Sequence, residues 1–151
     1  MREILYKAKT TLPGMNNMWV FGSLIHITET YKGEEDSQDC DIWQIVNEEG
    51  VAFDIDPNTI CQYIGHNDAL KQKIFENDIL EGYSKELYGQ QMELYYPTKG
   101  ESQKLLYKIN QNISGWEMRC IKYPKKHTSL IFTCNYKVIG NTIDNSELLI
   151  K

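Results

Sequence analysis

Residues 60–80 read ICQYIGHNDALKQKIFENDIL and carry the clearest structural signal in the chain. Apolar and β-branched side chains dominate both ends of this stretch, over residues 59–64 and 74–80, which is typical of strands. Residues 65–73, between them, are few and open with the loop-forming His66, Asn67 and Asp68. The stretch therefore predicts two strands joined by a loop or by one helical turn.

Outward from this stretch, apolar residues alternate with polar ones at a period of two, which predicts further strands. One hairpin is expected over residues 42–46 and 51–55, with a polar loop that ends in Gly50. A second hairpin is expected over residues 105–109 and 116–120. Further strands are expected at residues 1–9, 91–96, 130–135 and 136–140, and residues 144–147 offer an N-cap for a short terminal helical turn.

Residues 19–27 are expected to form a strand with apolar residues on both faces. One face carries Trp19, Phe21, Ile25 and Ile27, and the other carries Val20, Leu24 and His26. This pattern predicts a strand that is buried on much of both faces.

The composition favours β structure over helix. The chain has 151 residues, 41% of them hydrophobic and 25% charged, which is close to the average for globular proteins. The hydrophobic residues include 17 Ile and 10 Tyr but only 3 Ala, a balance that suits pleated sheet. We expect a mainly β fold, a β-rich α+β arrangement with few short helices, made of one domain or of two small lobes.

The net charge of −5 is unevenly distributed along the chain. Residues 1–78 contain 6 basic and 14 acidic residues, whereas residues 79–151 contain 10 basic and 7 acidic residues. Most of the acidic excess flanks the apolar run 42–46, where solvated loops and turns are expected: Glu34, Glu35, Asp36, Asp39, Asp41, Glu48 and Glu49.

Cysteine usage and the start of the chain predict a cytoplasmic protein of a reducing compartment. The cysteines Cys40, Cys61, Cys120 and Cys134 form no C-x-x-C pair, so free buried thiols are expected. No apolar segment at the start resembles a signal peptide, and the longest uncharged stretch, residues 10–28, is too broken to span a bilayer.

Several blocks of the chain resemble motifs of one known family. Residues 62–65 (QYIG) are similar to Q-Y-T-G, and residues 74–79 (IFENDI) are similar to I-F-E-G-D-I, with Asp68 matching an aspartate of the loop between them. Residues 138–149 (VIGNTIDNSELL) resemble a closing V-I-G-N-I-x-x-N-P-E-L-L. Residues 2–9 and 19–24 resemble the opening R-E-I-x-x-R-A and W-V-x-G-x-L. These motifs are those of the YopX family, small proteins of bacterial phages and prophages.

The resemblance implies a fold, a set of motif residues and a biological setting. It implies an N-terminal β region over residues 1–65, packed on a barrel-like C-terminal region over residues 66–151. It also implies frequent oligomers, residence in the cytoplasm of a bacterial host and no established activity. The motif residues, for which we expect a structural role, are Gln62, Tyr63, Gly65, Asp68, Glu76, Asp78, Gly140 and Asn141.

Two departures from the family motifs concern turns. Asn77 stands where the family has the glycine of E-G-D, and asparagine is the non-glycine residue that best tolerates positive φ, so that turn should form. Lys71 stands where a glycine of the loop would fall, which permits a helical turn there instead.

No pattern in the sequence announces catalysis or a cofactor. The histidines His26, His66 and His127 lack any metal-ligand spacing, and neither a phosphate-binding glycine loop nor a nucleophile motif occurs. Asp54 with Asp56, and Glu76 with Asp78, lie two residues apart, as a cation site would require, but polar strand faces and turns explain them as well. We expect no enzyme, no metal and no cofactor.

Two kinds of binding remain open. The first is self-association into a homo-oligomer, because a chain with many aromatic residues and strand edges can bury surplus surface against copies of itself, or against an unknown phage or host protein. The alternative is nucleic-acid binding through the basic and aromatic segment 104–126, although the pI near 5.2 disfavours it. No membrane partner is expected. The candidate nucleic-acid contacts are Lys104, Lys108, Arg119, Lys122, Lys125 and Lys126.

Overall fold

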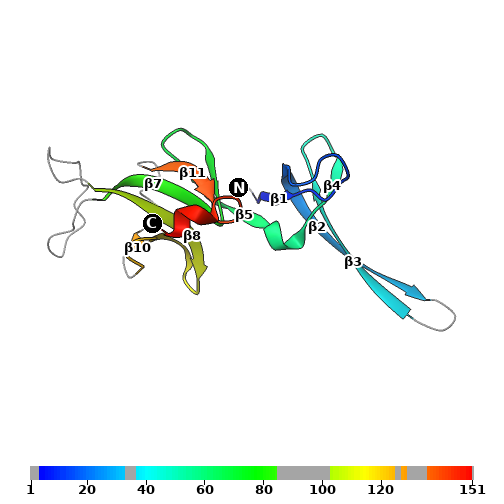
Figure 1. Ribbon diagram of the computed structural model, residues 1–151. Coiled ribbons are helices and arrows are strands. Elements are labelled where there is room, and N and C mark those ends of the chain that lie inside the picture. The colour runs from blue at the N-terminus through cyan, green and yellow to red at the C-terminus, as the bar shows by residue number, and fades with distance from the viewer. Residues whose placement is uncertain (1–3, 33–36, 85–102, 125–126, 129–135, 151) are drawn as a thin grey trace. The chain divides into compact units, whose positions relative to one another are not determined.

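A computed structural model of the chain describes residues 4–32, 37–84, 103–124, 127–128 and 136–150 (Figure 1). The chain divides into two compact units, Met1–Gly65 and His66–Lys151. Strands make up most of the described residues, and the described helical segments are two short 3-10 helices, η1 (Pro57–Thr59) and η3 (Ser146–Ile150). The predicted mainly β class and the terminal helical turn are confirmed.

The first unit is an antiparallel sheet in the order β4-β3-β2-β1-β5, and the sheet continues from β5 to β6 beyond the division of the chain. The predicted hairpin over residues 42–46 and 51–55 is confirmed as β3 and β4, and Gly50 has the positive φ of 79° that its turn requires. The strands are β1 (Tyr6–Lys9), β2 (Trp19–Lys32), β3 (Ser37–Val46), β4 (Ala52–Asp54), β5 (Cys61–Asn67) and β6 (Lys73–Phe75).

One face of this sheet carries the core of the first unit. Ala8, Val20, Ile45 and Ile55 are buried there and pack against partly buried hydrophobic residues. The isolated bridge between Thr10 and Ile55 closes this core at one end of β1. The partly buried residues are Tyr6, Leu24, Trp43, Phe53 and Ile60.

The strands β2 and β3 are much longer than their neighbours. β1 pairs with β2 only from Trp19 to Gly22, and β4 pairs with β3 only from Gln44 to Val46. Beyond these positions β2 and β3 continue as a two-stranded ribbon, which we call the arm and define as residues 26–32 of β2 with 37–43 of β3. In Figure 1 the arm extends away from β1 and β4.

The second unit is a separate antiparallel sheet in the order β10-β9-β8-β7-β11. The predicted hairpin of residues 105–109 and 116–120 is confirmed as β8 and β9. The order of the described strands is open rather than closed, so the barrel-like form expected for this region is not seen in them. The strands are β7 (Asp78–Ser84), β8 (Gln103–Asn112), β9 (Gly115–Cys120), β10 (His127–Thr128) and β11 (Lys137–Asn141).

The core face of the second sheet is covered in part by Tyr136. Its ring meets the ring of Tyr107 edge-on at a centroid distance of 5.2 Å and lies over Gly82, where a Cβ atom would come within 2.1 Å of it. Burial raises the pKa of the Tyr136 phenol above its usual value of 10.0, although a hydrogen bond with Tyr107 opposes the shift. The buried residues of this face include Leu80, Leu105, Tyr107, Ile109, Met118 and Cys120.

The opening stretch forms strands at both ends, but the expectation of one strand over residues 74–80 is wrong. A turn at Glu76 and Asn77 separates β6 from β7, and Asn77 takes the positive φ of 64° predicted for it. Lys71 also adopts a positive φ, 67°, so the loop keeps a glycine-like turn and the alternative helical turn does not form. The strands expected at residues 91–96 and 130–135 lie outside the described residues.

Candidate interaction surface

The face of the first sheet opposite its core carries exposed apolar side chains from β2. Phe21 is 48% exposed, Ile25 37% and Ile27 41%. The prediction that this strand is buried on much of both faces is therefore wrong, because only the side of Val20 and Leu24 packs into the core. We call the opposite side the outer face and define it by Phe21, Ile25 and Ile27 of β2 with Ile42 and Val46 of β3.

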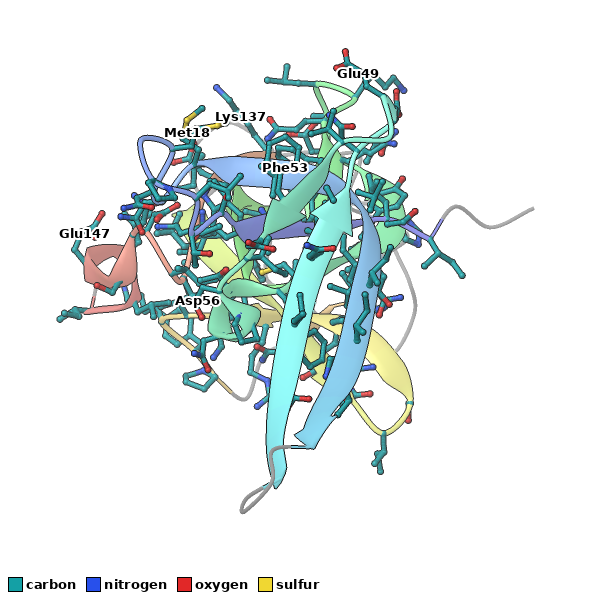
Figure 2. The ribbon with its side chains drawn as sticks, turned by 90° about the vertical axis from the view of Figure 1, so that its right-hand side faces the viewer. Met18, Glu49, Phe53, Asp56, Lys137 and Glu147 are labelled. Atoms are coloured by element: carbon teal, nitrogen blue, oxygen red, sulfur yellow. The ribbon has the colours of Figure 1, made fainter. Side chains whose placement is uncertain are left out.

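Cross-strand pairing makes the outer face continuous over β2 and β3. Ile27 lies opposite the half-buried Ile42, and Ser23 lies opposite the half-buried Val46. Gln44 lies opposite Ile25 and donates a hydrogen bond to the Asp54 carboxylate at 2.8 Å, which forms a polar margin on the side of β4. Figure 2 shows β2 and β3 as two neighbouring ribbons that continue beyond the labelled Phe53.

Cationic side chains cover the aromatic ring at the base of the outer face. The Nζ atoms of Lys7 and Lys9 lie 4.9 and 5.6 Å from the centroid of the Trp19 ring, within the range of cation–π attraction. Lys7 is only 8% exposed, so its aliphatic stem packs against the sheet while its charge lies over the indole. Lys7 and Lys9 on the neighbouring strand β1 therefore hold the Trp19 ring, and the more exposed apolar side chains of β2 follow it along the strand.

The other side of the arm carries a polar and aromatic cluster. The His26 ring stacks on Trp43 at a centroid distance of 3.8 Å and an interplanar angle of 9°. His26 Nε2 lies 3.2 Å from Asp41 Oδ1, and the Thr28 hydroxyl donates a hydrogen bond to the same oxygen at 3.1 Å. These contacts fix the side chains on this side of the arm, where Trp43 is partly buried and His26 and Thr28 stay exposed. Among the described residues, no group of His, Cys, Asp or Glu is arranged to hold a metal ion.

The structure brings together two of the six basic residues proposed for nucleic-acid contact. Lys108 and Arg119 lie opposite each other on β8 and β9. Arg119 is already engaged, because its guanidinium donates hydrogen bonds to the carboxylate of Glu117 on the same strand. Lys122 lies instead beside Tyr123, with its Nζ atom 5.5 Å from the ring centroid. The side chain of Lys104 and all of Lys125 and Lys126 lie outside the described residues.

Asp68 is a buried carboxylate that holds a loop and a strand together. It is 1% exposed, and its Oδ1 accepts hydrogen bonds from the backbone N–H groups of Leu70 at 2.7 Å and Gln72 at 2.9 Å. Its Oδ2 accepts a third from the N–H of Val138 on β11 at 3.0 Å. A carboxylate that satisfies three backbone donors stabilises the conformation of the loop and its attachment to β11.

Asp78 and Asn141 play similar parts in two further turns. Asp78 is 2% exposed and accepts a hydrogen bond from the N–H of Phe75 at 2.8 Å, across the turn between β6 and β7. The Asn141 side-chain oxygen accepts from the N–H groups of Ile143 and Asp144 at 2.9 and 2.8 Å. These side chains replace backbone partners that a tight turn cannot supply.

The two turns are also joined to each other. The N–H of Thr142 donates to the carbonyl of Asn77 at 2.9 Å, which ties the turn after β11 to the turn between β6 and β7. Gly140 leaves room for the Asn145 side chain within the turn after β11, because a Cβ atom at position 140 would come within 2.3 Å of the Asn145 side-chain oxygen.

The remaining motif residues lie on strands and turns rather than around a cavity. Gln62 pairs with Tyr6 in the sheet, and the N–H of Tyr63 donates to the carbonyl of Leu5 at 2.8 Å. Gly65 has a positive φ of 84° at the division between the units, and Glu76 is half-buried in the turn before β7.

The two aspartates considered as a shared cation site bind different groups. Asp54 accepts from Gln44, whereas Asp56 caps the 3-10 helix η1 by accepting from the N–H of Asn58 at 2.9 Å.

The outer face was missed in the sequence because nothing in β2 alone marks which side is covered. Its apolar residues alternate equally well on both sides, and exposure depends on the short lengths of β1 and β4, which leave the arm without neighbours among the described strands. The usable signal is a difference in strand length, since β2 has 14 residues and β1 has 4.

The described part of the chain contains no helix long and apolar enough to cross a membrane. No curated protein matches the chain. One similar solved structure is the crystal structure of protein EF1440 from Enterococcus faecalis, with 15% identity and a TM-score of 0.49, covering 99% of each chain. The model of a protein family described as YopX protein matches residues 13–150, nearly the whole sequence. The chain therefore belongs to the YopX family, as its motifs predicted.

Proposed function

We propose that this protein acts by binding, as a homo-oligomeric interaction module of a phage or prophage in the bacterial cytoplasm, and that it has no catalytic activity. The observation that carries the proposal is the outer face, where Ile25 and Ile27 of β2 stand exposed near Ile42 of β3, at the base of the two-stranded arm. Exposed apolar side chains that form a continuous surface, rather than occurring singly, mark sites of association.

Burial of the outer face offers a direct energetic gain. Removing an isoleucine side chain from water contributes about 1.5–3 kcal/mol when burial is complete. An isolated two-stranded ribbon is also only marginally stable in water, so the arm gains support from any partner that covers it. Self-association satisfies both needs with the surface that the chain already carries.

The buried polar residues give no support to an enzymatic role. Asp68, Asp78 and Asn141 accept hydrogen bonds from backbone N–H groups, and each is needed for its turn. Nucleic-acid binding through residues 104–126 has less support than self-association, because Arg119 is engaged by Glu117 and Tyr107 is buried in the core.

The proposal is tested by measuring the molar mass of the full chain by light scattering after size exclusion, at micromolar concentration. The wild type should have a multiple of the 17.6 kDa chain mass. The double variant Ile25→Thr, Ile27→Thr should shift toward the monomer, because threonine keeps the β propensity of the strand but removes apolar surface.

A matched control changes exposed apolar residues away from the outer face. Leu70 is 64% exposed and Ile113 is fully exposed, both in turns of the second unit. The variant Leu70→Thr, Ile113→Thr should keep the wild-type mass. A monomeric wild type, or equal masses for the two double variants, would overturn the proposal.

A further inference from the structure

The strand β2 has a long open edge on the side of β1. Its pairing with β1 ends at Gly22, while β2 itself runs on to Lys32. Among the described strands, only β3 pairs with residues 23–32, and it lies on the other side of β2. We call this side of residues 23–32 the open edge.

The ladder identifies which backbone groups point out of the open edge. The N–H of Thr10 donates to the carbonyl of Met18, so Met18 directs its backbone groups toward β1. In an antiparallel strand every second residue directs both its N–H and its C=O to the same side. Val20 and Gly22 therefore direct their backbone N–H and C=O groups toward β1. Beyond the end of β1, Leu24, His26 and Thr28 direct theirs out of the same edge.

An independent contact gives the same alternation. The N–H of Ile55 donates to the carbonyl of Trp43, so Trp43 directs its backbone groups away from β2. Gln44, the next residue, must then direct its groups toward β2, where it faces Ile25. Ile25 is thus bonded to β3, and its neighbours Leu24 and His26 face outward.

The first part of the open edge, residues 23–28, lacks the features by which proteins protect exposed strands, whereas residues 29–32 include one glutamate and one lysine. Residues 23–28 read SLIHIT and contain no proline, no glycine, and no lysine or carboxylate. The register with β3 runs from Ser23 to Lys32 without a bulge. On the opposite edge of the arm, β3 carries the exposed carboxylate of Asp41.

We propose that the open edge pairs in antiparallel fashion with the open edge of a second copy of this chain. This inference rests on the proposed self-association and names its contact. Residues with outward backbone groups must face their own kind, and β1 of each copy already occupies this edge up to Gly22. Two strands of this length therefore fit with Thr28 on the two-fold axis, which places His26 and Thr30 of one copy opposite Thr30 and His26 of the other. The register is then even, so Ile25 and Ile27 of both copies lie on the same side.

Self-pairing extends the open edge into a wider sheet and leaves the outer faces themselves uncovered. The two outer faces join into one apolar surface across a four-stranded sheet, which is more stable than a two-stranded ribbon. The contact is the same patch on both copies and closes on itself as a two-fold interface.

Proline at position 28 tests the role of the backbone. Thr28→Pro removes an N–H that faces the open edge, and it leaves the bonds to β3 in place because those come from the neighbouring residues. The matched control is Thr28→Val, which loses the same hydroxyl bond to Asp41 but keeps the N–H. By sedimentation, Thr28→Pro should raise the dissociation constant about tenfold or more, whereas Thr28→Val should change it about twofold or less.

Single cysteines locate the two-fold axis even if Thr28→Pro disturbs the arm. Ile27→Cys, Thr28→Cys and Glu29→Cys are oxidised one at a time in the full chain, with the wild type as the control for native thiols. Only the residue on the axis meets its own copy with Cα atoms about 4.4–6.8 Å apart, the reach of a disulfide. One of the three variants should give a covalent dimer on a non-reducing gel.

The outcomes separate this contact from self-association in general. An associated protein that gives no cross-link at any of the three positions overturns the strand pairing and leaves the proposed function in place. Equal dissociation constants for Thr28→Pro and Thr28→Val would also overturn the strand pairing and leave the proposed function in place. A wild type that stays monomeric overturns both.

Discussion

The turns of the second unit and the arm of the first unit differ in what their side chains do. The turns contain family-motif residues, whereas the arm and its base carry exposed apolar side chains. Asp68, Asp78 and Asn141 are buried, and each satisfies backbone donors of its own turn. Ile27 of the arm and Ile25 at its base are exposed, and no described strand covers their edge. In this protein the motif residues therefore hold the fold, and the surface best suited to binding lies in a segment that no functional motif marks.

This difference predicts opposite responses to mutation. A change in the turn network should alter the free energy of unfolding of the second unit and affect association only through folding. A change on the outer face should alter association and have little effect on unfolding, because solvent-exposed side chains contribute little to the core. Substitutions in the turn network test the expected effect on unfolding, and the variants at Ile25, Ile27 and Thr28 test the expected effect on association.

Replacement of the buried carboxylate should have the largest effect. Asp68→Ala removes the acceptor of three backbone hydrogen bonds, one of which joins the loop to β11. Hydrogen bonds to a charged acceptor are stronger than neutral ones, so we expect a loss of about 2–4 kcal/mol in the free energy of unfolding. Denaturation in urea, followed by tyrosine and tryptophan fluorescence, measures this loss.

Asp56→Ala is the matched control for Asp68→Ala. Asp56 also accepts a hydrogen bond from a backbone N–H two residues later, but it is not buried and caps only the short η1. Its loss should cost about 1 kcal/mol. Equal losses in the free energy of unfolding for the two variants would contradict the larger stabilising role of Asp68.

A smaller loss of stability is expected from a substitution at Gly82, where the ring of Tyr136 occupies the space that a side chain would fill. In Gly82→Ala the new Cβ atom would lie 2.1 Å from the Tyr136 ring, so the ring must move away from the sheet. Such overpacking costs about 1–3 kcal/mol. Thermal unfolding of Gly82→Ala, Tyr136→Ala and the double variant measures the coupling between the two positions.

The double variant supplies the control for that coupling. Once Tyr136 is reduced to alanine, the methyl group at position 82 has space, so the second substitution should cost clearly less than it does alone. Strict additivity of the two losses would contradict the contact between Gly82 and Tyr136.

The sequence predicted strands and turns well where local chemistry determines them. Period-two alternation located both hairpins, and the tolerance of asparagine for positive φ correctly predicted the turn at Asn77. Lys71 shows the limit of this reasoning. Its positive φ is imposed by the loop that Asp68 holds, so the contacts of another residue override the local preference of lysine.

The exposed surface was beyond prediction for a different reason. Alternation shows that Phe21, Ile25 and Ile27 share a side, but the side that is covered depends on which strands pair and where they stop. β1 ends its pairing at Gly22, and that boundary depends on residues far from the arm in sequence. The open edge is therefore a property of the sheet as a whole and not of any single strand.

The smallest expected effect compares the two turns that use positive φ without glycine. Lys71→Gly should stabilise the protein by about 0.5–1 kcal/mol, because lysine pays about 1–2 kcal/mol to adopt this conformation and glycine offsets part of the gain through its freedom in the unfolded chain. Asn77→Gly should stabilise by about 0.5 kcal/mol or less, since asparagine already tolerates positive φ. Urea midpoints measured in parallel rank the two variants. Lys71→Ala, which removes the charge but keeps a Cβ atom, should leave the midpoint nearly unchanged, and a larger gain for Asn77→Gly than for Lys71→Gly would reverse the ranking and show that backbone strain does not distinguish these turns.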